Sequence, residues 1–234
     1  LYINDAPVSA PGERFLYSTY AYTTLQALVE QVSGKAFAEF VSENICAPLH
    51  LKSIKPESVN QLILHRARNY QRNASTQRLV HAPEVDLSNK LAGGGFVSTA
   101  KDIAQFGNAL LTNKLLTPAT ASEFFAAQSL KNGETTHYGL GFEVLNAKKG
   151  GNAIRRYNID SNKNAPVMVG HSGGAVGASS YLLMVPEEKL VVSVLCNIQG
   201  ADLSNASKEL ANYYKQLDAG NSIMQQIAKF LTGL

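Results

Sequence analysis

The stretch from Val167 to Asn197 most constrains what this chain can fold into. It opens with a short β-branched run, Val167–Val169, and passes through the small or polar residues Gly170–Gly174. Two apolar runs follow, Ser179–Val185 and Leu190–Leu195. Apolar runs of this length, separated by a turn that contains proline and charge, are typical of antiparallel strands joined in a hairpin. The sequence therefore predicts antiparallel strands with a small-residue corner at Gly170–Gly174.

The same corner fits the pattern of a nucleophile elbow, Gly-x-Ser-x-Gly, written here as Gly170-His171-Ser172-Gly173-Gly174. In such an elbow, Ser172 would attack a carbonyl from a strand-to-helix turn, with an acid and a histidine further along the chain. Strands are predicted after Ser172 instead of a helix, and all five histidines lie at or before His171. The elbow therefore remains only the weaker alternative.

A second interpretation makes this stretch the edge of a substrate cleft. His171 and Ser172 would bind polar groups, and Gly173 would let an acyl substrate lie close to the backbone. The N–H of Gly174 could then donate to a developing oxyanion, a contribution of about 3 kcal/mol when the donor is well placed. A plain glycine-rich turn with a surface histidine is the third interpretation.

Composition limits the function classes. The chain has 234 residues, of which 45% are hydrophobic and 17% charged, as expected for one globular domain. Its net charge of +3 is too small to indicate nucleic-acid binding, and no apolar run approaches the roughly 20 residues of a membrane span. Cys46 and Cys196, far apart and each within an apolar run, are expected to be buried free thiols. No metal is implied, because four histidines show no ligand spacing: His50, His65, His81 and His137.

Helix signals surround the strands. Two predicted helices are marked by apolar stripes, the first at Leu25, Leu28, Val29 and Val32, stopping at Gly34, and the second at Phe37, Phe40, Val41 and Ile45. A third begins at a capping box, Thr99 and Asp102, and a fourth at Thr117-Pro118. The run Gly93–Gly95 predicts a turn where backbone passes close to another element. Residues 52–92 form a long polar connection, as in a flap or cleft wall.

Tyr17 stands just before the first predicted helix, where a tyrosine commonly packs as a hydrophobic staple. A functional alternative places its phenol oxygen at a cleft floor. There, a neighbouring ammonium would lower the pKa from ~10, so that the phenolate could accept a proton from a serine. The partners would be a serine and a lysine one helical turn later. The one Ser-x-x-Lys, Ser98 to Lys101, is better explained as a helix cap.

Three segments together resemble a known family. They are Phe15–Tyr22 followed by Val29–Gly34, then Ala92–Thr99, then His171–Ser180. In this order they resemble the serine β-lactamase-like and penicillin-binding proteins, a group that includes class C β-lactamases, D-aminopeptidases and related esterases. The pattern is most similar to the mitochondrial serine β-lactamase-like branch and its bacterial relatives.

The resemblance implies an α+β fold, with an antiparallel sheet flanked by helices and a helical lobe. It implies a serine hydrolase that forms an acyl-enzyme on a peptide, ester or β-lactam-like substrate, without cofactor or metal. The implied catalytic groups are Tyr17, as the partner of the general base, and the Gly174 N–H, as an oxyanion donor. The implied substrate-binding residues are His171, Ser172, Gly173 and Thr19. His171 replaces the family's usual lysine, and Thr19 stands where many members have asparagine.

In the family, the nucleophilic Ser-x-x-Lys precedes the tyrosine motif, and sixteen residues precede Tyr17 here. We therefore expect residues 1–234 to be the C-terminal, larger part of one domain, with an amphipathic extension over 221–234. An upstream segment or companion chain would carry the nucleophile, and this chain alone would be inactive. The alternative function is a non-catalytic binding or assembly protein. The resemblance also fits a homo-oligomer and an extracytoplasmic location.

Overall fold

A computed structural model describes residues 4–145 and 167–218, so the extension predicted over 221–234 lies outside the described residues. The helices are α1 (Thr19–Ser33), α2 (Phe37–Val41), α3 (Ala100–Leu111), α4 (Pro118–Phe124) and α6 (Ser204–Asp218). The strands are β1 (Lys55–Pro56), β2 (Tyr70–Arg72), β3 (Leu79–His81), β4 (Phe96–Val97), β5 (Glu143–Leu145), β6 (Met168–Ala175), β7 (Ala178–Val185) and β8 (Leu190–Cys196). A π-helical turn extends α2 over Ser42–Cys46, and 3-10 turns span Ser88–Gly93 and Pro186–Glu188. Within the described ranges, no helix combines the length and apolarity needed to cross a bilayer.

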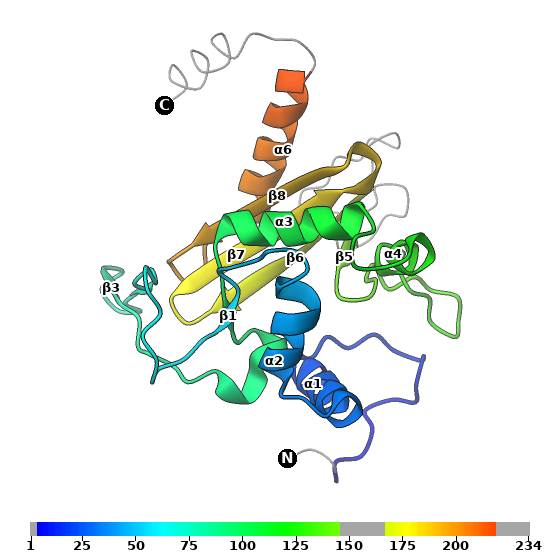
Figure 1. The fold of residues 1–234 in the computed structure, drawn as a ribbon, viewed down its shortest axis with the longest axis horizontal. Coiled ribbons are helices and arrows are strands. Elements are labelled where there is room, and N and C mark those ends of the chain that lie inside the picture. Colours follow the sequence, from blue (N-terminus) through cyan, green and yellow to red (C-terminus); the bar gives the residue numbers. More distant parts are fainter. Residues whose placement is uncertain (1–3, 146–166, 219–234) are drawn as a thin grey trace.

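The main sheet is antiparallel, in the order β5-β6-β7-β8 (Figure 1). The predicted corner at Gly170–Gly174 is wrong, because these residues continue the strand β6. Their low strand propensity is offset by pairing with β7, which extends to Ala175 opposite Ala178. The chain instead reverses just after Ala175, where Gly177 takes a φ of 77°.

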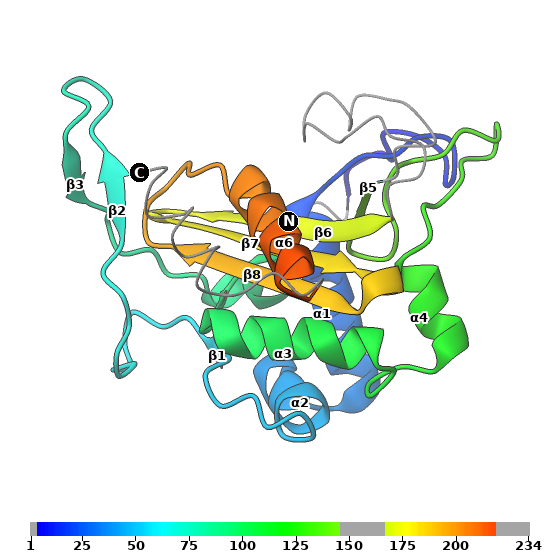
Figure 2. The same cartoon turned by 90° about the horizontal axis from the view of Figure 1, so that it is seen from above.

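Helices cover both faces of the sheet (Figures 1 and 2). On one face, Leu110 of α3 packs with Val169 and Met184. On the other, Ala211 of α6 packs with Tyr181 and Leu183. Successive side chains of a strand point to opposite faces, so one set of strands builds both cores. The predicted combination of an antiparallel sheet with flanking helices is confirmed.

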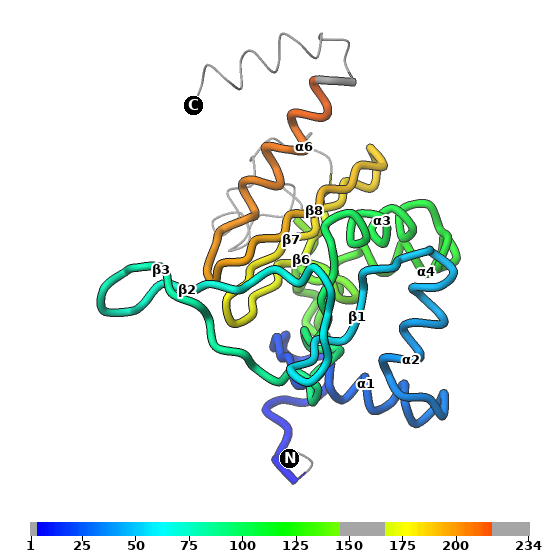
Figure 3. Tube along the Cα trace, turned by 60° about the vertical axis from the view of Figure 1, so that its left-hand side comes forward, coloured from blue at the N-terminus to red at the C-terminus, as the bar shows by residue number. Residues whose placement is uncertain are grey.

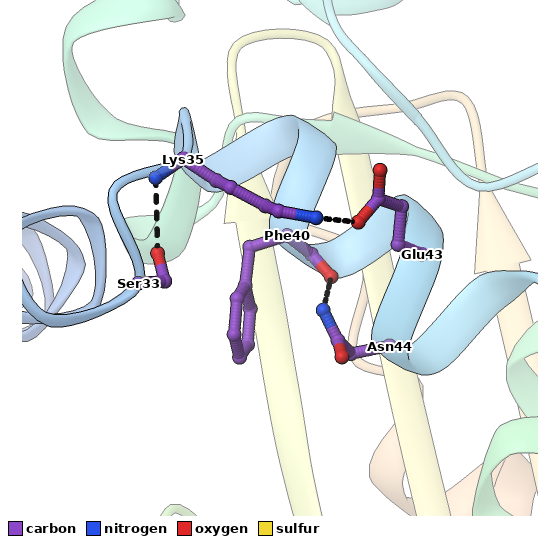
Figure 4. Close-up of polar contacts among 5 residues, drawn as sticks. All are labelled: Ser33, Lys35, Phe40, Glu43 and Asn44. Atoms are coloured by element: carbon purple, nitrogen blue, oxygen red, sulfur yellow. Dashed lines mark hydrogen bonds and ion pairs between the residues drawn. The ribbon is translucent and has the colours of Figure 1, made fainter.

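The helices α1 and α2 are joined by a short polar connection (Figure 4). The first ends at Gly34, as predicted, because Gly34 adopts a left-handed φ of 69° and donates its N–H to the Glu30 carbonyl. Ser33 Oγ then accepts from the N–H of Lys35, and the Lys35 ammonium pairs with Glu43. These contacts fix the direction in which α2 leaves α1.

One face of α1 is uncovered. The apolar stripe predicted on this helix includes Leu25, Leu28 and Val32, whose exposed fractions are 52%, 56% and 79%. Among the described residues, nothing packs closely enough to bury this face, which we call the α1 stripe. An amphipathic helix normally turns its apolar face to a core, so the α1 stripe is an unusual surface.

The start of α3 is tied to the loop before β1. Thr99 Oγ1 accepts from the Asp102 N–H at 3.3 Å, which confirms half of the predicted capping box. The Asp102 carboxylate does not return to the Thr99 N–H, which donates instead to Ser53 Oγ. The Asp102 carboxylate instead accepts hydrogen bonds from both the N–H and the hydroxyl of Ser53, each at 2.7 Å. Burial by itself would raise the pKa of Asp102, but the hydrogen bonds from Ser53 outweigh it and hold the pKa below its ordinary value.

The long connection over residues 52–92 lies at one end of the sheet. It contains the β2–β3 hairpin, which extends away from the sheet (Figure 3). The N–H of Tyr70 donates to the Asn197 carbonyl at 2.9 Å, and the Asn69 amide donates to the Val176 carbonyl at 3.3 Å. The connection therefore braces the turn between β6 and β7.

We predict that Asp102→Asn weakens the pH dependence of stability. The folded state depresses the pKa of Asp102, so it binds fewer protons than the unfolded chain, and the stabilisation is lost as pH falls through the depressed value. At pH 7 the variant should lose about 1–2 kcal/mol in the free energy of unfolding. Urea unfolding at pH 7 and at acidic pH measures both effects. The exposed Glu209→Gln is the control, and an equal acid sensitivity in Asp102→Asn and wild type would contradict the prediction.

Candidate active site

Three rings from three separate segments meet beside β6. They belong to Tyr17, just before α1, to Tyr138, before β5, and to His171, within β6. The ring of Tyr17 lies 6.0 Å from that of His171 and 6.2 Å from that of Tyr138, measured between centroids. The hydroxyl of Tyr138 lies 2.9 Å from Nε2 of His171. We call these residues the ring cluster. It brings together two predicted site residues and adds Tyr138, which was not predicted from the sequence.

A strained turn places Tyr138 in the cluster. His137, immediately before it, has a left-handed φ of 59°, and Gly141 has a φ of 95°. A Cβ at Gly139 would lie 2.2 Å from the carbonyl oxygen of Phe124, so only glycine fits there. The run Tyr-Gly-Leu-Gly that starts at Tyr138 is the one sequence signal that could have pointed to this turn.

Tyr17 does not have the environment that the sequence analysis expected of a base. Its side chain is 58% exposed, and its pKa is raised, first by partial burial and then by Tyr22 and Glu143. An ammonium would lower the pKa, but no cation is among the described groups that shift it. In this chain Tyr17 is therefore a protonated phenol at neutral pH.

Gly174 lies on an open part of the sheet. Strand β5 pairs with β6 only as far as Gly170, whereas β7 pairs with β6 as far as Ala175. The stretch from His171 to Ala175 therefore has one backbone edge without a strand partner among the residues described. A Cβ at Gly174 would meet nothing within 4 Å, so there is space beside it. This geometry is compatible with the predicted oxyanion donor, which stays a prediction.

The side chains of His171 and Ser172 lie on opposite faces of the sheet. His171 is opposite Leu182, which packs on the face with α3, and Ser172 is opposite Tyr181, which packs on the face with α6. They therefore do not form one wall, and His171 is not oriented to serve as a base for Ser172. A pocket of about 240 Å³ lies beside Ser172, and its lining also includes Gly173, Ser180, Tyr181, Asp202 and Ser204.

Gly173 follows Ser172 in strand β6. A Cβ there would come within 2.1 Å of the Ser180 hydroxyl, its cross-strand neighbour. Glycine at this position therefore leaves the backbone of β6 free of a side chain, so that a ligand can approach it closely, as at the edge of a cleft.

Thr19 contacts the glycine turn at the start of β4. A Cβ at Gly93 would lie 2.6 Å from Thr19 Cγ2, and the Ala92 N–H donates to Gln26 Oε1 at 3.2 Å. The prediction that the glycine run passes close to another element is confirmed, and that element is α1. Thr19 thus packs against this turn at the N-terminal end of α1.

The cysteines and acidic residues offer no further chemistry. Cys46 and Cys196 are both free thiols, as predicted, but only Cys46 is buried, because Cys196 at the end of β8 is half-exposed. Within residues 4–145 and 167–218, no group of three or more histidine, cysteine, aspartate or glutamate side chains is arranged to hold a metal ion. Ser98 and Lys101 are not part of the ring cluster, because the Ser98 hydroxyl bonds to Ser53 and to the Thr99 carbonyl at the start of α3.

Comparison with known proteins gives one family. The model of the Beta-lactamase family matches residues 2–214. The human protein named serine beta-lactamase-like protein LACTB, mitochondrial, is 33% identical over 90% of this chain and 42% of its own length. The chain therefore spans less than half of that relative.

Two solved structures share the fold. The octameric penicillin-binding protein homologue from Pyrococcus abyssi has a TM-score of 0.67 at 24% identity, and the match covers 86% of this chain and 42% of that one. A D-stereospecific amidohydrolase from Streptomyces sp. has a TM-score of 0.65 at 20% identity, covering 82% and 52% of the respective chains. At these identities, the likeness concerns the fold alone.

We predict that Gly139→Ala destabilises the chain. The new methyl group would meet the Phe124 carbonyl oxygen at 2.2 Å, and backbone cannot move aside as a flexible side chain can. The free energy of unfolding should fall by about 1–3 kcal/mol in urea titration. Gly174→Ala is the matched control, since its Cβ has free space, and it should stay within about 0.5 kcal/mol of wild type. Equal stability of the two variants would contradict the prediction.

Proposed function

The chain belongs to the Beta-lactamase family, and from this we propose that it forms the greater part of a serine hydrolase that works through an acyl-enzyme. The family is of the serine hydrolase type, and the predicted β-lactamase/transpeptidase-like fold is confirmed. The observation that carries the proposal is the ring cluster, in which Tyr17 and His171 lie 6.0 Å apart beside the open stretch of β6.

Each proposed role follows from the position of a group. A serine hydroxyl attacks the substrate carbonyl. Tyr17, ionised by the ammonium of the proposed lysine, takes the proton of that hydroxyl and passes it to the leaving group, and water then hydrolyses the acyl-enzyme. The N–H of Gly174 stabilises the oxyanion. His171 binds the polar end of the substrate. Gly173 and Thr19 complete the proposed binding surface, whereas Ser172, predicted from the sequence to belong to it, faces the separate pocket on the α6 side.

We propose that the serine and its lysine lie on a segment outside this sequence. The one Ser-x-x-Lys present, Ser98 to Lys101, is occupied at the start of α3. The raised pKa of Tyr17 also supports the proposal, because a base of this kind needs an ammonium beside it and the described residues supply none. The human relative is more than twice as long as the aligned part of this chain, so it has room for such a segment.

Two uncovered surfaces support a missing structural partner. The α1 stripe exposes Leu25, Leu28 and Val32. Among the strands that the structure describes, β8 is at the outer edge of the sheet, and it carries no charged residue in Leu190–Cys196. Native edge strands are commonly protected by charge, proline or a covering element, so a further strand along β8 would complete the sheet.

The proposed substrate is a peptide or another amide, with an ester as the alternative. This preference rests on the amidohydrolase among the similar structures, since amide cleavage is what its name states for that protein. We also propose that the protein self-associates, because the structurally similar protein from Pyrococcus abyssi is octameric. A non-catalytic binding protein, and a hydrolase that uses Ser172, are the alternatives to be tested.

Labelling with a fluorophosphonate probe separates these alternatives. We expect the complete protein to be labelled on a serine outside residues 1–234 and this chain alone to stay unlabelled. Ser172→Ala in the complete protein should keep the label. Label found on Ser172 would support the elbow mechanism, and a complete protein with no labelled serine would support the non-catalytic alternative.

Tyr17→Phe tests the proton transfer. Removing the hydroxyl leaves the ring in place, so kcat of the complete enzyme on a peptide or ester substrate should fall by roughly 10²–10⁴-fold. Tyr20→Phe is the control, since Tyr20 lies on α1 with 68% of its side chain exposed. A kcat for Tyr17→Phe within about twofold of the control would remove Tyr17 from the mechanism.

A further inference from the structure

Both ring nitrogens of His171 are engaged, and the partners differ in kind. Nδ1 lies 2.6 Å from the carbonyl oxygen of Ser172. Nε2 lies 2.9 Å from the hydroxyl of Tyr138. A carbonyl oxygen can only accept a hydrogen bond, so Nδ1 must carry a proton. In a neutral imidazole, Nε2 is then the acceptor, and the proton between Nε2 and Tyr138 belongs to the phenol.

We propose that Tyr138 is a positioning residue that holds His171 in the Nδ1–H tautomer by donating a hydrogen bond from its hydroxyl to Nε2. The role of this tautomer in catalysis rests on the proposed function, whereas the tautomer itself follows from the two contacts of the ring. Nothing in the motif at His171–Gly173 indicates such a partner, since Tyr138 is far away in the sequence.

Tyr138 is well placed to remain a donor. Its pKa is raised, first by burial and then by the hydroxyl of Tyr22, so the phenol keeps its proton. The Tyr22 hydroxyl lies 3.5 Å from that of Tyr138, a long contact that leaves the bond to His171 as the stronger one. Phe15 packs on the ring of Tyr138 at 5.2 Å between centroids. The ring therefore has little freedom to turn its hydroxyl away from His171.

The tautomer divides the work within the ring cluster. The Nε2 lone pair accepts a hydrogen bond from Tyr138, and Nδ1–H donates to the Ser172 carbonyl. The neutral imidazole therefore has no free site that could take a proton from a nucleophile. That task falls to Tyr17, whose hydroxyl has no such assigned partner in the cluster. His171 instead presents the face and edge of a fixed ring to the substrate. In this arrangement the histidine positions the substrate, and Tyr17 is the one member of the ring cluster that transfers a proton.

Nitrogen-15 NMR of the histidine rings in the full 234-residue chain tests the tautomer without any need for activity. The signals of His171 are assigned by their loss in His171→Gln. We expect wild type to show a protonated Nδ1 and an unprotonated Nε2. Tyr138→Phe, which keeps the ring but loses the hydroxyl, should reduce that separation, because only the Ser172 carbonyl then favours the Nδ1–H tautomer. Tyr22→Phe is the control and should leave the separation intact.

Three outcomes would overturn the proposal. One is a wild-type spectrum with the proton on Nε2, which needs no variant and so does not depend on the folding of Tyr138→Phe. Another is an unchanged tautomer in folded Tyr138→Phe. The third is kinetic: in the complete enzyme, we expect Tyr138→Phe to lower kcat by about tenfold or more with little change in KM, because a wrong tautomer misplaces a catalytic-site histidine. An unaltered kcat would deny the positioning role even if the tautomer is as proposed.

These results are separable from those that test the proposed function. If the fluorophosphonate probe labels no serine while His171 shows the expected tautomer, only the hydrolase proposal fails. If the probe labels a serine and the tautomer is not fixed, only the role of Tyr138 fails.

Discussion

The pairing of β6 with β7 is the interaction on which the rest of the structure depends. It sets Gly173 opposite Ser180 and His171 opposite Leu182, and it assigns each side chain of β6 to one face of the sheet. A slip of one residue would exchange the faces, so that His171 would point to α6 and Ser172 to the ring cluster. The buried Val169 and Met184, which face each other across the same pair of strands, oppose such a slip because it would turn Val169 away from Met184 and from Leu110 of α3.

Local patterns in the sequence were sufficient for much of the fold. The end of α1 at Gly34, the Thr99 cap and the two long strands after Gly177 were all predictable, since each depends on residues close together in the chain. The corner expected at Gly170–Gly174 was wrong for the opposite reason. Glycine disfavours a strand by itself, and the pairing with β7 that overrides this preference is not visible in a single segment.

The candidate site was predictable only in part. Tyr17 and His171 stand in recognisable motifs, and the structure brings them within 6.0 Å. Tyr138 could not be identified in the same way, because its role depends on the contact with His171 rather than on its neighbours in sequence. Ser172 shows the reverse case: it stands beside His171 in the chain, yet the alternation of the strand turns its side chain to the other face.

The exposed stripe on α1 also has a consequence for handling the chain in solution. The α1 stripe is an exposed apolar surface, formed by Leu25, Leu28 and Val32. Such surfaces on different molecules can pack against each other and so remove apolar area from water. At high concentration this surface favours association between copies of the chain. Cooling weakens this kind of attraction and sulfate strengthens it, so cold buffers low in such salts should keep the sample dispersed.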